Sequence, residues 1–160
     1  MVETRKATLD RAPIQKVAML FGIVFLLVTI LGFIPGITSD YDRLTEFGDV
    51  GAKVLGILGV NWLENVVHLL YGLLGLALAR TWNGSWAYFI GGGLVYIVVW
   101  LYGLLIDLDS SANIIGVNSA ANWLHFVLAL TMLLIGFILG RDRGYVAGRD
   151  GVAAEAAPRL

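Results

Sequence analysis

Four long apolar segments alternate with shorter polar segments along this chain. Three stretches contain no Asp, Glu, Lys or Arg, namely 17–39, 81–106 and 110–140. A fourth apolar stretch, 62–79, is interrupted only by Glu64 near its start. A helix needs about 20 such residues to cross the hydrocarbon core of a bilayer. The pattern therefore predicts transmembrane helices at about 14–36, 62–80, 86–106 and 121–140.

The composition agrees with a membrane protein of one domain. The 160 residues are 58% hydrophobic and 14% charged, whereas soluble domains average roughly 25% charged residues. We predict an all-α fold, an integral membrane four-helix bundle that forms a single domain over residues 1–140. Residues 141–160 are rich in Gly, Ala and alternating charges, which is typical of a disordered tail.

The positive charges lie mostly on one side of the predicted bilayer. Nine of the eleven Lys and Arg residues fall at the ends that include both termini, and only Arg43 and Lys53 fall in the opposite loops. Because Lys and Arg are enriched on the cytoplasmic side, we expect both termini to be cytoplasmic. The net charge of −1 gives no reason to expect nucleic acid as a partner. The expected partner is the lipid bilayer, with other membrane proteins or a second copy of the chain as further candidates.

A short motif, G-V-N-x-x-x-N-x-x-H, occurs twice and includes both histidines of the chain. The matching positions, 57 apart, are Asn61 and Asn118, Asn65 and Asn122, and His68 and His125. The preceding helices match at a displacement of 71, which relates Gly22 to Gly93 and Gly32 to Gly103. Each unit holds two crossings, so both copies point the same way, as in parallel repeats. The sequence thus predicts two parallel two-helix repeats whose Asn/His sets face each other near the outer surface.

The first polar residues of each motif suit helix capping. Asn61 and Glu64 form an N-x-x-E pattern, in which each side chain accepts from a free amide at the helix start. Asn118 can cap the last helix in the same way, although Ala121 replaces the glutamate. Helix starts leave unsatisfied N–H donors by geometry, so a structural role is the simplest interpretation.

Deeper in the same helices, Asn65, His68, Asn122 and His125 are the candidate site residues. At 1.5 Å per residue, His68 lies about 10 Å along the helix from Asn61, inside the apolar zone. Polar groups there are costly unless they are paired, and ionisable ones are functional candidates. The simplest hypothesis is a polar clasp, in which each histidine bonds to an asparagine of the opposite repeat and joins the second and fourth helices.

Three functional hypotheses stand beside the clasp. The two imidazoles suit a haem iron or a divalent metal ion, with Glu64, Asp107 or Asp109 as accessory carboxylates. A quinone or another apolar ligand is the second candidate, and a proton or solute pathway is the third. The chain has no cysteine, which excludes thiolate metal sites. No catalytic residue is assigned, and an enzyme is not expected.

The first outer loop, residues 37–60, has a helical pattern of apolar residues. Phe47, Val50, Val54, Ile57 and Leu58 fall on one face of a helix, although four glycines weaken the pattern. The sequence therefore predicts a short interfacial or partly re-entrant helix in this loop.

Several strings of the sequence resemble one bacterial family. They lie at 32–38, 65–72, 100–107 and 122–125, and read GFIPGIT, NVVHLLYG, WLYGLLID and NWLH. Over about 14–140 the chain is similar to the small four-helix membrane proteins of domain of unknown function 4383. The resemblance implies a bacterial inner-membrane location and supplies no activity, cofactor or catalytic residue. We expect a noncatalytic structural or accessory membrane component; the alternative is a redox or ligand-binding protein that uses His68 and His125.

Overall fold

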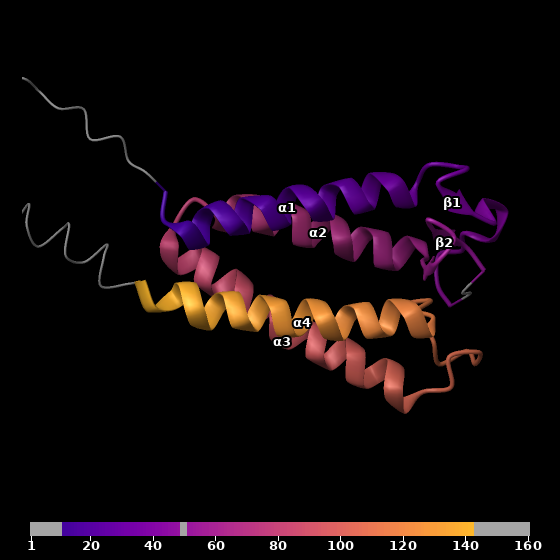
Figure 1. Cartoon of the computed structure of the whole chain (residues 1–160). Helices are drawn as coiled ribbons and strands as arrows, with labels where there is room; N and C mark the ends of the chain where they lie inside the picture. The colour runs from indigo at the N-terminus through magenta and orange to yellow at the C-terminus, as the bar shows by residue number, and fades with distance from the viewer. Residues whose placement is uncertain (1–10, 49–50, 143–160) are drawn as a thin grey trace, which may run out of the picture.

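The computed structural model describes residues 11–48 and 51–142, and four helices dominate it (Figure 1). The helices are α1 (Pro13–Gly32), α2 (Trp62–Leu78), α3 (Trp82–Leu105) and α4 (Ser119–Leu139). Short 3-10 helices follow at Tyr41–Arg43 and Gly140–Asp142. The predicted four-helix architecture is confirmed. The predicted tail lies almost wholly outside the described residues.

The helices pack as two antiparallel pairs. α1 lies mainly against α2, and these two helices form the first pair. α3 lies mainly against α4, and these two form the second pair. Both ends of the described chain lie at one end of the bundle, here called the terminal end (Figure 1). The opposite loop end carries the long α1–α2 connection and the shorter α3–α4 connection.

The described part of the connection between α1 and α2 forms a 3-10 turn and a small sheet and not the expected helix. Val50, on the predicted helical face, lies outside the described residues. Strands β1 (Thr38–Ser39), β2 (Lys53–Val54) and β3 (Leu58–Gly59) form an antiparallel sheet in the order β1-β2-β3. Leu55 and Gly56 turn between β2 and β3 with φ of 54° and 70°, a left-handed conformation that a helix does not contain. The all-α prediction is corrected accordingly to a mostly helical fold with a three-stranded cap.

Two helix ends differ from the predicted ones by four residues, and capping explains both. α1 ends at Gly32, four residues early, where the Thr38 hydroxyl donates to the carbonyl oxygens of Leu31 and Gly32 at 3.0 and 3.2 Å. α3 begins at Trp82 because the Thr81 hydroxyl accepts from the Gly84 N–H at 3.0 Å. Such side-chain partners satisfy the free backbone groups at helix ends.

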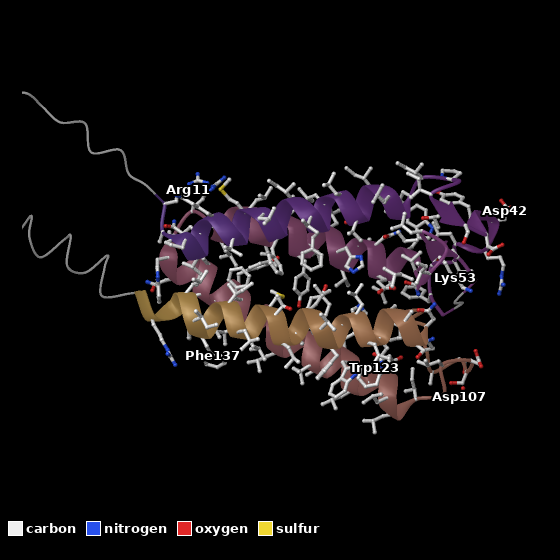
Figure 2. All side chains as sticks on the ribbon, in the orientation of Figure 1. Arg11, Asp42, Lys53, Asp107, Trp123 and Phe137 are labelled. Atoms are coloured by element: carbon white, nitrogen blue, oxygen red, sulfur yellow. The ribbon has the colours of Figure 1, made fainter. Side chains whose placement is uncertain are left out.

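The helices expose an apolar surface that suits lipid. α1, α3 and α4 are long and apolar enough to cross a membrane, and α2 is shorter at 17 residues. Large side chains such as Trp123 and Phe137 are 52% and 59% exposed on α4, and both are labelled in Figure 2. Extended apolar surfaces mark contact with a membrane or another protein, and the length and hydropathy of these helices favour a membrane. The chain is therefore a membrane protein.

Close packing within each pair depends on glycine at the contact. A Cβ at Gly22 of α1 would lie 2.9 Å from both the Gly72 carbonyl oxygen and the Leu76 amide nitrogen of α2. A Cβ at Gly93 of α3 would lie 3.2 Å from the Ala129 carbonyl oxygen and 2.8 Å from Leu133 Cγ of α4. Small residues at such points let helix backbones approach in a membrane.

We predict that Gly22→Ala destabilises the protein by about 1–3 kcal/mol, because its new methyl group meets backbone atoms that cannot rotate away. The matched control is Gly91→Ala in α3, where an added Cβ meets nothing within 4 Å. Thermal unfolding in mild detergent measures both variants. Equal unfolding temperatures for the two variants would contradict the packing argument.

Candidate functional site

Two asparagines hold the loop end together by reciprocal hydrogen bonds. Asn61 accepts from the Glu64 N–H at 2.9 Å, and Asn118 accepts from the Ala121 N–H at 2.9 Å, so each caps its own helix. Each side chain amide also donates across the molecule, Asn61 to the Ile114 carbonyl oxygen at 2.9 Å and Asn118 to that of Ile57 at 2.8 Å. The starts of α2 and α4 are therefore fixed relative to each other.

The next asparagines face inward within their own helix pairs. Asn65 and Asn122 are 0% and 2% exposed. A Cβ at Gly32 of α1 would lie 2.7 Å from Asn65 Cγ, and one at Gly103 of α3 would lie 2.8 Å from Asn122 Nδ2. Each asparagine thus fills the space that a glycine leaves on the neighbouring helix. They do not form the expected hydrogen bonds between α2 and α4, since Asn65 Oδ1, Asn65 Nδ2 and Asn122 Oδ1 find no partner among the described residues.

The contact between α2 and α4 is made by a glutamate and a histidine. Glu64 Oε1 lies 3.3 Å from His125 Nε2, and the two residues are 6% and 4% exposed. Half-buried His68 completes the group: one donor atom from each of the three residues lies within 4.8 Å of the others. We call Glu64, His68 and His125 the polar trio. The two histidines predicted to face each other do come together there.

An aromatic ring flanks each histidine of the polar trio. The Phe25 ring of α1 is 5.8 Å from the His68 ring at an angle of 32°, and the Tyr96 ring of α3 is 5.3 Å from the His125 ring at 34°. Phe25 and Tyr96 are 71 positions apart and the histidines 57 apart, the two displacements found in the sequence. The aromatic packing limits how the imidazoles can rotate.

A cavity of about 350 Å³ opens beside the polar trio. α1 and α4 form its sides, and β2, β3 and the residues around them cover its loop end. Apart from the polar trio, the lining of the cavity is apolar. It consists of Leu20, Phe21, Val24, Phe25, Val28, Val54, Leu58, Gly59, Val60, Ala121, Leu124 and Leu128. Leu20, Val24 and Leu124 are 57%, 47% and 38% exposed. The cavity therefore reaches the lipid-facing surface between α1 and α4.

The cavity lies on the side where α4 carries a smaller residue than α2 carries at the position 57 residues earlier. Tyr71 of α2 fills the space toward α3, where its hydroxyl donates to the Gly92 carbonyl oxygen at 3.0 Å and its ring lies 4.8 Å from Tyr96. The residue 57 positions later is Leu128, which is smaller, carries no hydroxyl and lines the cavity. The corresponding space between α4 and α1 is left open.

Three buried polar atoms of the trio lack hydrogen bonds. Glu64 Oε2, His68 Nδ1 and His125 Nδ1 find no partner within the part of the chain that the structure describes. Buried polar atoms are normally satisfied, and an unmet one costs about 1–3 kcal/mol. These atoms give the trio unused capacity to bind a metal ion or a polar ligand group.

The remaining predicted carboxylates lie elsewhere. Asp107 and Asp109 are exposed in the α3–α4 loop, where Asp107 Oδ1 accepts from the Asp109 N–H at 3.0 Å. They are not members of the polar trio. From the sequence alone, Glu64 fits best as part of the cap of α2. Its position four residues before His68 places both on one helix face, a signal that already favours a shared site.

The fold and the site define a helical membrane protein with a buried carboxylate–imidazole cluster beside a lipid-accessible cavity. The family model described as Domain of unknown function (DUF4383) matches residues 15–138. The chain belongs to this family, as its motifs indicated. No curated protein and no solved structure matches it.

We predict that Glu64→Leu destabilises the fold by about 1–3 kcal/mol, because it leaves His125 Nε2 buried without its partner. The double variant Glu64→Leu/His125→Leu should recover part of that loss, since contacting residues are not additive. Thermal unfolding in detergent measures the cycle, with exposed Asp109→Asn as a near-neutral control. Strict additivity of the two single changes would argue against the contact.

Proposed function

We propose that the chain is a multi-pass protein of the bacterial cytoplasmic membrane, built from two parallel two-helix repeats. Equivalent contacts support the duplication: Gly22 approaches Gly72 and Leu76, and their counterparts Gly93, Ala129 and Leu133 approach one another in the same way. These counterparts are displaced by the same 71 and 57 positions as the sequence motifs. The flanking of His68 by Phe25 and of His125 by Tyr96 adds a second equivalent contact.

In the proposed topology both termini are cytoplasmic. Arg11 lies at the terminal end of the bundle, whereas Asp42, Lys53 and Asp107 lie at the loop end (Figure 2). Lys16, Arg80 and Arg141 belong to the helix ends on the same side as Arg11. This distribution supports a cytoplasmic terminal end by the positive-inside rule, and it puts the polar trio nearer the outer surface.

The function that the geometry supports best is binding of an amphiphile from the outer leaflet. Such a molecule has an apolar body and one hydrogen-bonding head group, and quinones are one such class. The observation that carries the proposal is the cavity, whose apolar lining is interrupted only by the polar trio. Ligand sites combine mostly apolar walls with a few placed polar groups, and they begin at about 300 Å³. A haem macrocycle is larger than this cavity, so a smaller ring suits it better.

The two chemical zones of the cavity indicate how the ligand is oriented. Exposed Leu20, Val24 and Leu124 form its lipid-facing rim, so an apolar tail there remains in contact with the bilayer. The head group lies at the polar trio, where Glu64 accepts hydrogen bonds and neutral imidazoles donate or accept them. Satisfying the free atoms of the trio supplies the specificity.

A noncatalytic clasp between α2 and α4 is the second candidate, with Glu64 and His125, 3.3 Å apart, in place of the expected Asn–His bonds. In that case the trio only sets how the two helix pairs meet, and the cavity is filled by ordinary lipid chains. Interhelical polar contacts in membranes are worth about 0.6 kcal/mol on average, which suits a role in alignment. The two candidates differ in whether a head group is recognised.

The topology is tested with single cysteines, because the chain has none of its own. We expect Asp42→Cys and Asp109→Cys to react with a membrane-impermeant maleimide in intact bacterial protoplasts. Arg141→Cys, which is also at an exposed position, should react only after permeabilisation. Labelling of Arg141→Cys in intact protoplasts would reverse the proposed orientation.

Ligand binding is tested with a diazirine-bearing alkyl-1,4-benzoquinone in vesicles of phosphatidylethanolamine and phosphatidylglycerol. We expect cross-links at cavity residues such as Leu20 and Leu124, reduced at least fivefold by Leu128→Tyr, which fills the cavity as Tyr71 fills the opposite side. Leu130→Tyr, on the exposed face of the same helix, is the matched control. Equal labelling of both variants, or labelling spread over all lipid-facing helices, would leave only the clasp.

A further inference from the structure

We propose that Glu64, His68 and His125 bind one divalent transition-metal ion of the zinc class. The inference goes beyond amphiphile binding, because it concerns the polar wall of the cavity alone. Either property can hold without the other. The backbone N–H of Glu64 donates to the side chain of Asn61, which caps α2. The metal site gives the Glu64 carboxylate a separate role as a ligand.

The donor set has the chemistry of a known kind of metal site. Two imidazoles and one carboxylate bind Zn²⁺ in sites that keep a fourth position open, and non-haem iron sites use the same three groups. Glu64 and His68 come from successive turns of α2, and His125 comes from α4. The ion would therefore join the two helix pairs where they otherwise have few contacts.

The spacing of the donors is compatible with one ion. Their atoms lie within 4.8 Å of one another, so a central point is at most about 2.8 Å from each. Zinc bonds to imidazole and carboxylate are about 2.0–2.2 Å long. Each side chain needs to move inward by less than about 1 Å, a shift that rotation about the side-chain bonds supplies.

The unsatisfied atoms of the trio point independently to a cation. All residues that line the cavity lie in the described ranges. Among them, Glu64 is the only Asp, Glu, Lys or Arg residue. Its carboxylate is buried, and Oε2 has no hydrogen-bond partner there. A buried carboxylate is costly unless it is paired or coordinates a metal. A divalent ion between the carboxylate and the imidazoles balances this charge better than one hydrogen bond to His125.

The surroundings hold the imidazoles ready for coordination. Phe25 and Tyr96 pack against the two rings, so less rotational freedom is lost when the ion binds. The apolar cavity beside the trio keeps water from competing for the site. In the combined picture, the open coordination position faces the cavity where the head group of an amphiphile would lie.

The test is a titration of the full chain in mild detergent with Co²⁺, after removal of any affinity tag and treatment with EDTA. The chain has only two histidines and no cysteine, so visible d–d bands of bound Co²⁺ report on this site. We expect one ion per chain, displaced by Zn²⁺. Binding should weaken at least tenfold in each of Glu64→Gln, His68→Asn and His125→Asn.

The control is Asp107→Asn/Asp109→Asn, which removes exposed carboxylates outside the trio and should leave binding unchanged. Zinc-edge X-ray absorption of the unaltered chain adds a measurement that needs no variant, and it should show two imidazole ligands. No saturable binding, or binding that the control abolishes and Glu64→Gln does not, would overturn the metal site. Quinone labelling is measured with EDTA present, so its outcome does not depend on a bound metal ion. The metal site and the amphiphile site can therefore fail separately.

Discussion

The buried contact of Glu64 with His125, with His68 beside it, connects the halves of this bundle at the loop end, and the proposed site depends on that contact. Within each helix pair, glycines let backbones touch, as Gly22 does against α2 and Gly93 against α4. Between the pairs there are fewer contacts. In lipid, apolar surfaces gain little by meeting each other, so polar contacts help to align the pairs, although each is worth only about 0.6 kcal/mol on average. Glu64 and His125, with the reciprocal bonds of Asn61 and Asn118, supply that fixation at the loop end.

The cavity lies where the two helix pairs differ in their side chains. Tyr71 closes the space between α2 and α3, whereas Leu128 leaves the space between α4 and α1 open. The first outer loop is also longer than the second, and its strands β2 and β3 cover the cavity. In the proposed duplicated framework, matching positions bring two histidines together, and the differences between the two halves create a binding space on one side of them.

The sequence predicted those features that depend on periodicity and spacing. Apolar run lengths located the four helices, and the 57-residue displacement paired His68 with His125. The predictions from the sequence were wrong where contacts between distant segments determine the structure. The outer loop has a helical pattern of apolar residues, but its chain turns at Leu55 and Gly56 so that β2 pairs with β3. Asn65 was assigned to a partner on α4, but the glycine opposite it on α1 offered a closer fit. The cavity depends on side-chain volumes across helices, which no single helix pattern contains.

The most direct test of this account is proximity of α2 and α4 at the polar trio, measured by thiol cross-linking in the cysteine-free chain. The variant Glu64→Cys/His125→Cys is treated with dibromobimane, which becomes fluorescent only when it joins two nearby thiols. Leu73→Cys/Leu130→Cys, at exposed positions of the same two helices, is the control. The account predicts intramolecular fluorescence for the first pair alone. Absence of cross-linking there, or equal cross-linking in the control, would contradict it.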